Sequence, residues 1–89
     1  MRTFFLFIIF LTFSLNAITY LDAKKGEKEY EKGNFDVSEK KFESASSSST
    51  EKDPVLFYNL GNSLFQQKKY DDALNKYEEA LSTDNKKLK

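Results

Sequence analysis

The 89-residue chain contains no cysteine, no histidine and no tryptophan. Without cysteine it can form neither a disulfide framework nor a thiolate metal site. Without histidine it lacks the most common general base and the most common metal ligand in proteins. Basic and acidic residues number 14 each, so the formal net charge is zero. Nucleic-acid-binding domains usually carry a basic excess, and we therefore expect no nucleic-acid partner.

The hydroxyl and carboxylate groups that are present do not form the usual catalytic sets. Ser44 and Ser46 to Ser49 offer hydroxyls, but no histidine or cysteine is available for a nucleophile–base pair. The carboxylates of Asp71-Asp72 and Glu78-Glu79 are neighbours in sequence, and neighbouring residues of a helix point in different directions. The chain also has no glycine-rich phosphate loop. We predict that it is not an enzyme and that it uses no cofactor or metal.

The first residues of the chain differ in composition from the rest. Met1-Arg2 is a short basic start, residues 4–15 are almost wholly apolar, and Ala17 is a small residue suited to precede a cleavage point. This order is typical of a secretory signal peptide, here over residues 1–17.

An uncleaved membrane anchor is the alternative for this segment. Residues 3–21 carry no charge and approach the ~20 residues that span a bilayer. Both interpretations place the rest of the protein across a membrane, in the periplasm or at a membrane-associated cell envelope. Both also limit membrane contact to residues 1–21.

Residues 19–52 are echoed, 35 positions later, by residues 54–87. The matching positions are Gly26 and Gly61, Tyr30 and Phe65, Asp36 and Asp71, Lys41 and Lys76, Phe42 and Tyr77, and Ala45 and Ala80. A period in the 30s with helical composition is typical of a helical-repeat protein. Repeat proteins of this kind present extended binding surfaces, so the period favours binding over catalysis.

The later copy predicts two helices that pair as a hairpin. Asp53-Pro54 is a strong helix start, because Asp accepts a bond from a first-turn amide and Pro has no N–H to satisfy there. The apolar face of the first helix is Phe57, Leu60, Gly61, Leu64 and Phe65. The second helix begins near Tyr70, with an apolar face of Tyr70, Ala73, Leu74, Tyr77, Ala80 and Leu81. The glycine in mid-helix predicts close approach of the second helix.

The earlier copy predicts a weaker hairpin. Its first helix, roughly residues 20–32, is poor in apolar residues, which an outermost helix tolerates because one of its faces has no neighbour. Gly33 supplies a tight turn, and Asn34 is a suitable N-cap for the second helix. We expect the hydroxyl-rich run Ser44 to Thr50 to end that helix and to link the two copies.

The pattern of the later copy resembles the tetratricopeptide repeat. It reads Phe57-x-x-Leu60-Gly61-x-x-Leu64, then Tyr70-x-x-Ala73-x-x-x-Tyr77-x-x-Ala80-Leu81. It departs from the family at Lys68, where glycine is common, and at Asn85, where proline usually ends the repeat. The resemblance implies an all-α fold: two helix-turn-helix hairpins at 19–52 and 54–87, a short α-solenoid behind the N-terminal hydrophobic signal or anchor helix. A narrower resemblance, through Tyr58 to Asn62, is to small exported tetratricopeptide proteins of bacterial envelopes, including those of aerotolerance operons.

The resemblance also implies that the first helix of each repeat lines a concave face on which a protein or peptide docks. In the later copy the candidate peptide-binding residues are Val55, Tyr58, Asn59, Asn62, Phe65 and Gln66. An asparagine amide can bond both the N–H and the C=O of an extended peptide. The alternative is that Asn59 and Asn62 are solvated residues common in the repeat and that Phe65 belongs to the core.

The equivalent face of the earlier copy is acidic. Family members that grip a C-terminal carboxylate use a lysine and an asparagine where this chain has Ala23 and Glu27, so we do not expect that activity. Glu27, Glu29 and Glu31 either prefer a basic partner or form a solvated acidic face.

Two repeats are fewer than the roughly three that usually give a stable array. We therefore expect apolar side chains on the outer face of the last hairpin. Such an exposed face leaves four alternatives: self-association, packing on a partner, marginal stability, or a position at the front of a longer repeat array. The predicted function is a non-catalytic protein–protein interaction module exported to the cell envelope. The alternative is a membrane-anchored structural subunit or spacer of an envelope complex with an uncleaved N-terminal helix.

Overall fold

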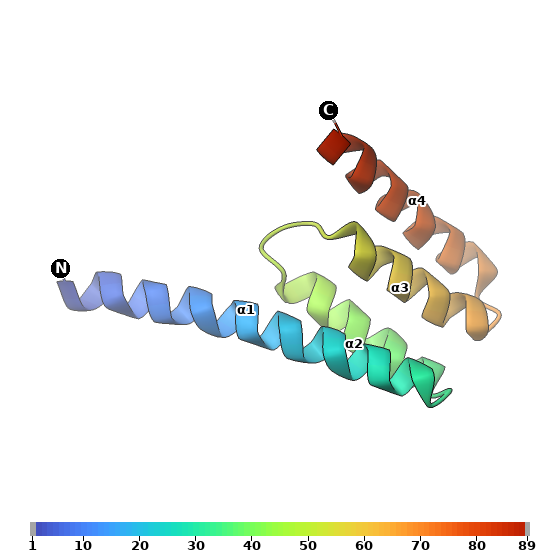
Figure 1. The fold of residues 1–89 in the computed structure, drawn as a ribbon, viewed down its shortest axis with the longest axis horizontal. Helices are drawn as coiled ribbons and strands as arrows, with labels where there is room; N and C mark the ends of the chain where they lie inside the picture. The colour runs from blue at the N-terminus through green and yellow to red at the C-terminus, as the bar shows by residue number, and fades with distance from the viewer. Residues whose placement is uncertain (1, 89) are drawn as a thin grey trace.

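The computed structural model describes residues 2–88, with side-chain surroundings for residues 16–84. Its elements are α1 (Arg2–Glu31), α2 (Phe35–Ser48), α3 (Pro54–Gln66) and α4 (Tyr70–Leu88), and residues 2–88 contain no strand. α1 pairs with α2 and α3 with α4, and the two hairpins meet where α2 packs on α3 (Figure 1). The prediction of an all-α fold with helical hairpins is confirmed.

α1 is one helix of 30 residues, and its N-terminal part extends past the end of α2 (Figure 1). The prediction of a separate helix beginning near Tyr20 is wrong. Residues 3–25 contain no proline or glycine, so nothing in the backbone interrupts the helix. The side chains of residues 1–15, most of the predicted signal or anchor segment, lie outside the described residues. Among the described residues, no helix is both long and apolar enough to cross a membrane.

Both hairpins turn through a residue with left-handed backbone geometry. Gly33 has a φ of 83° and Lys68, its equivalent 35 positions later, has a φ of 66°. At the second turn the Lys68 N–H donates to the Phe65 carbonyl at 2.9 Å and the Lys69 N–H donates to the Leu64 carbonyl at 3.0 Å. This pair of bonds is the Schellman motif, and the same pair closes α1 at Gly33. The tight turn predicted at Gly33 is confirmed.

The two predicted helix starts differ in outcome. The Asp53 carboxylate accepts a bond from the Val55 N–H at 3.0 Å, which confirms the predicted cap of α3. Asn34 stands at the N-cap of α2 but makes no side-chain cap bond. Its amide nitrogen donates instead to the Glu29 carboxylate at 2.8 Å. The predicted N-cap position of Asn34 is confirmed, but its side chain does not cap the helix, because the tight turn places the amide beside a stronger, charged acceptor.

The serine-rich run belongs mainly to α2. The helix continues to Ser48, so the prediction that Ser44 to Thr50 end it is wrong for most of the run. The Ser44 hydroxyl donates to the Asp22 carboxylate at 2.5 Å, a contact between α2 and α1. A hydroxyl with a partner on the neighbouring helix no longer competes for its own backbone, which permits serine in the helix. The link between the hairpins is residues 49–53.

The core fills the space between the two hairpins. Its buried residues are Phe42, Ala45, Leu56, Leu60, Leu64 and Ala73, with Ala23 and Tyr77 packed against them. Two glycines let aromatic rings approach the helix backbone closely. A Cβ on Gly61 would lie 2.6 Å from the Tyr77 ring, and a Cβ on Gly26 would lie 2.7 Å from the Phe42 ring. The close approach predicted at Gly61 is confirmed.

A polar seam also joins α2 to α3. The hydroxyls of Ser38 and Ser63 are 2.8 Å apart and both residues are fully buried. At the edge of the seam, the Glu39 carboxylate accepts a bond from the Gln67 amide at 2.8 Å and pairs with the Lys69 ammonium at 3.1 Å. The α2–α3 interface is therefore part apolar and part hydrogen-bonded.

Several apolar residues predicted to face the core lie at the surface. Phe65 is 51% exposed, so the interpretation of Phe65 as a core residue is wrong. It lies at the end of α3 and packs edge-on against the Tyr70 ring, 5.2 Å away, at the hairpin turn. Leu74 and Leu81 on α4 are also more than half exposed, which confirms the expected apolar outer face of the last hairpin. Conversely Leu56, left out of the predicted face, is buried.

Candidate functional site

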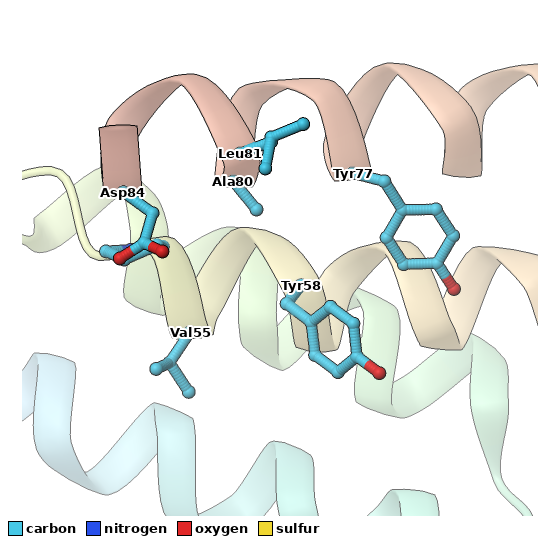
Figure 2. A pocket seen from close by; sticks show the side chains of 7 residues that line it. Val55, Tyr58, Tyr77, Ala80, Leu81 and Asp84 are labelled. Atoms are coloured by element: carbon cyan, nitrogen blue, oxygen red, sulfur yellow. The ribbon is translucent and has the colours of Figure 1, made fainter. Parts of the chain in front are cut away.

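Two hollows flank α3. The larger, the α3–α4 groove, has a volume of about 550 Å³. Its lining residues are Pro54, Val55, Tyr58, Tyr77, Ala80, Leu81 and Asp84. Figure 2 shows Val55 and Tyr58 projecting from α3, and Tyr77, Ala80 and Leu81 coming from α4. The surface is therefore built mainly from apolar and aromatic groups.

The α3–α4 groove has a charged end and an aromatic end. Asp84 is the charged residue among those that line it, and it lies near the start of α3 (Figure 2). Towards the other end the rings of Tyr58 and Tyr77 are 5.7 Å apart and tilted by 46°. Tyr58 is 55% exposed and Leu81 62% exposed, so apolar area is available for contact.

The smaller hollow, the α1–α3 hollow, has a volume of about 200 Å³. It is lined by Glu27, Tyr30, Glu31, Phe42, Asn59 and Asn62. Two carboxylates from α1 thus face two amides from α3. The chemistry of this lining suits a polar ligand that carries hydrogen-bond donors and positive charge.

A hydrogen bond from α4 orients one of the amides. The Tyr77 hydroxyl donates to the Asn62 amide oxygen at 2.6 Å. Burial raises the pKa of Tyr77, and repulsion from the negative charges that Tyr58 and Tyr30 acquire on ionisation raises it further. Tyr77 therefore stays protonated around neutral pH and keeps this bond. This bond fixes the orientation of the Asn62 amide, whose nitrogen can donate to a ligand.

The predicted peptide-binding residues are divided between the two hollows and the end of α3. Val55 and Tyr58 line the α3–α4 groove, whereas Asn59 and Asn62 line the α1–α3 hollow. On α3 these residues follow the i, i+3, i+4 spacing of one helical face, and the two edges of that face border different hollows.

The remaining predicted residues lie at the end of α3, outside both linings. Phe65 packs on Tyr70 at the hairpin turn. The Gln66 amide nitrogen lies 3.5 Å from the Tyr30 hydroxyl, at the outer limit of a hydrogen bond. Both residues are exposed and reach the solvent beside the hollows rather than within them.

Sequence reasoning missed the contribution of α4 to the site. Tyr77, Ala80 and Leu81 are predicted as core positions of the hairpin, yet they also line the α3–α4 groove. The 35-residue period is the signal that could have identified them. Their equivalents in the earlier copy are Phe42, Ala45 and Ser46, and two of these pack against α3. The described residues include no group of three or more carboxylates placed to hold a metal ion.

Comparison with protein families identifies the later copy. Residues 54–86 match the tetratricopeptide repeat. The match spans α3 and most of α4 and supports the resemblance seen in the sequence. Neither a search of curated proteins nor a search of solved structures returned a match. The narrower resemblance to exported proteins of aerotolerance operons therefore has no support. The matched repeat contributes residues to both hollows.

Proposed function

We propose that the chain is a non-catalytic interaction module that holds another protein through the α1–α3 hollow. Tetratricopeptide repeats typically mediate protein–protein contacts, and the match over residues 54–86 supports a role of this class. The observation that carries the proposal is the pairing of amides with carboxylates in one hollow. Asn59 and Asn62 lie there with Glu27 and Glu31, in contact with solvent.

The hollow has the chemistry to bind an extended segment that contains lysine or arginine. The free amide nitrogen of Asn62 can donate to a peptide carbonyl, and Asn59 can both donate and accept. Glu27 and Glu31 attract a cation, with modest strength because both are exposed. The ring of Tyr30 offers apolar area to the alkyl part of the same side chain. Binding should therefore weaken as the salt concentration rises.

The test uses an alternating Lys-Ser peptide as a probe and an alternating Glu-Ser peptide as its control. We expect the basic peptide to shift the side-chain amide resonances of Asn59 and Asn62 in an NMR titration of the full chain. Glu31→Lys should abolish these shifts. Glu51→Lys, a matched change of an exposed residue in the link between the hairpins, should leave them unchanged. Equal shifts with the acidic peptide, or no effect of Glu31→Lys, would refute the site.

We further propose that this module acts at the cell envelope. The proposal rests on the composition of residues 1–17, with a basic start, an apolar run and a small residue before the point of cleavage. The second candidate is an anchored spacer that retains this helix in the bilayer, supported by the charge-free run 3–21. Mass spectrometry of the mature N-terminus decides between them. A chain that begins after Ala17 supports cleavage, and Met1 on membrane-bound protein supports the anchor.

A further inference from the structure

The chain contains the same groove twice. The residues that line the α3–α4 groove correspond, 35 positions earlier, to Thr19, Tyr20, Ala23, Phe42, Ala45, Ser46 and Ser49. In the first hairpin this groove is filled by α3. Phe42 and Ala45 are buried there to 1% and 0% exposure, in one cluster with Leu56, Leu60 and Leu64 of α3. The packing of α3 therefore shows what kind of element such a groove accepts.

We propose that the α3–α4 groove binds an amphipathic α-helix of a partner protein, in the direction in which α3 lies on the first hairpin. The groove continues the α2–α3 interface by one repeat. Only residues 49–53 separate the end of α2 from the start of α3. The first turn of α3 therefore lies near Ser49, at one end of the groove in the first hairpin. By the same equivalence, the partner helix starts near Asp84 and runs antiparallel to α4.

The negative charge at the Asp84 end of the groove determines which residues suit the first turn of the partner helix. A helix N-terminus carries a partial positive charge, and the Asp84 carboxylate complements it. Asp53, the cap of α3, is a second exposed carboxylate next to the groove residue Pro54. A partner helix with lysine or arginine in its first turn is therefore favoured over one with aspartate or glutamate.

The same charges disfavour a second copy of this chain as the occupant. An antiparallel α4 from a second copy brings Asp71 and Asp72, in its first turn, to the Asp84 end. An α1 placed in the repeat register offers Lys25 and Glu29 where α3 has leucines. Burying such charges without partners is unfavourable.

The residues of α3 that are buried in its groove specify the apolar face of the partner. Leu56, Leu60 and Leu64 stand at i, i+4 and i+8, a single helical stripe. Two further positions on this stripe are polar in α3, and each has a polar partner on α2. Ser63 meets the Ser38 hydroxyl and Gln67 meets the Glu39 carboxylate, each at 2.8 Å.

Those polar partners are absent from the equivalent positions of α4. Ser38 is replaced by Ala73 and Glu39 by Leu74, which is 55% exposed. A hydroxyl or amide placed over these positions would lose its side-chain partner and keep only backbone carbonyls as acceptors. The partner helix is therefore apolar at i, i+4, i+7, i+8 and i+11, with a small residue such as alanine at i+7. This is a wider apolar stripe than that of α3.

The probe for this groove is a peptide of residues 53–69 that carries Ser63→Ala and Gln67→Leu, called the apolar probe. Its binding to the full chain is measured by fluorescence anisotropy, beside the unmodified 53–69 peptide. We expect the apolar probe to bind about tenfold more tightly, because Leu74 cannot replace the Glu39 carboxylate that accepts a bond from Gln67 in the first groove, whereas a leucine in the probe would pack on it. Equal affinity of the two peptides would overturn the assigned face.

Variants of the protein locate the binding. Leu81→Asp, at a residue 62% exposed, should abolish binding of the apolar probe. Leu21→Asp is the matched control, because Leu21 is 54% exposed on α1, away from the α3–α4 groove. It should bind the probe as the unmodified chain does. Equal binding by Leu81→Asp would overturn the proposal, since the peptide would then occupy another surface such as the seat of α3.

Two further measurements test direction and occupant. A probe with two glutamates in its first turn should bind more weakly, and Asp84→Lys in the protein should reverse this preference. Sedimentation of the full chain tests for a second copy. If it finds a dimer that Leu81→Asp dissociates but the apolar probe does not dissociate, a second copy fills the groove and the proposal is wrong. Glu31→Lys should leave probe binding unchanged, so this test is independent of the α1–α3 hollow.

Discussion

Replacing Lys68 by glycine should stabilise the protein. Lys68 holds a φ of 66° at the turn between α3 and α4, whereas its equivalent in the first hairpin is Gly33. A side chain with a Cβ costs about 1–2 kcal/mol in the left-handed region. Glycine recovers this energy but adds conformational freedom to the unfolded chain, which costs about 0.4–1 kcal/mol. The net expected gain is about 1 kcal/mol.

The structure indicates that little else changes in this variant. The Lys68 side chain is exposed, and the ion pairs of the described lysines do not include it. The bond from its N–H to the Phe65 carbonyl, at 2.9 Å, is a backbone bond that glycine retains. In a chain of this size a gain of about 1 kcal/mol raises the midpoint of thermal unfolding by about 4–8 °C.

The assay is thermal and urea unfolding of the full chain followed by circular dichroism. Lys68→Ala is the matched control, because it removes the charge but keeps the Cβ, and it should change the midpoint little. Gly33→Ala should lower stability by about 1 kcal/mol, since it places a Cβ in the same backbone conformation. The reasoning is refuted if the glycine and alanine variants of Lys68 unfold at the same temperature.

Three further predictions concern the core. Gly61→Ala should lower the free energy of unfolding, measured in urea, by a net ~1 kcal/mol or more, because the Tyr77 ring must move to admit the methyl group. This net loss already includes the ~1 kcal/mol by which alanine favours a helix. The loss should be smaller in a Tyr77→Ala background. Ser38→Ala should cost about 1 kcal/mol, whereas the Ser38→Ala/Ser63→Ala double variant should be near neutral, because no hydroxyl is left without its partner. Because the pKa of Tyr77 is raised in the folded state, its contribution to stability is complete below about pH 10, the unfolded value, and is lost as the pH rises through the higher folded value. Tyr77→Phe should therefore show a smaller loss of stability in alkaline urea titrations, and at pH 7 it should cost about 1 kcal/mol through the lost bond to Asn62.

Local sequence chemistry was sufficient to predict the start of α3 and its close contact with α4. The Asp53-Pro54 pair defines the helix start through groups that are adjacent in the chain, and the structure contains that cap. Gly61 likewise indicated a close helix contact, because its cost in a helix requires a compensation. Such features depend on few neighbours, so they can be predicted without knowledge of the tertiary packing.

Burial could not be predicted in the same way. The spacing of Phe57 to Phe65 identifies apolar positions but not which neighbour covers them. Phe65 is exposed because it lies at the end of α3 beside the turn, whereas Leu56 is buried in the interface with the first hairpin. The predicted start of α1 near Tyr20 was wrong for another reason. The composition changes near Ala17, but a change in composition need not interrupt a helix.

The candidate site was predicted in part. Placing Asn59 and Asn62 on a binding surface required only their position on the first helix of the repeat, and both line a hollow. Placing them apart from Val55 and Tyr58 required knowledge of both neighbours of α3. A helical pattern read one element at a time has no information on what lies on either side.

The joint between α2 and α3 also has a consequence for cooperativity. The buried cluster draws on both hairpins, so loss of either one would expose residues of the other. The two hairpins should therefore unfold as one unit, with the slowest amide hydrogen exchange in α2 and α3 and faster exchange in α4, whose exposed face has fewer tertiary contacts. A helix bound in the α3–α4 groove would add a second joint of the same kind. Slower amide exchange in α4 would then report occupancy of the groove without any label on the ligand.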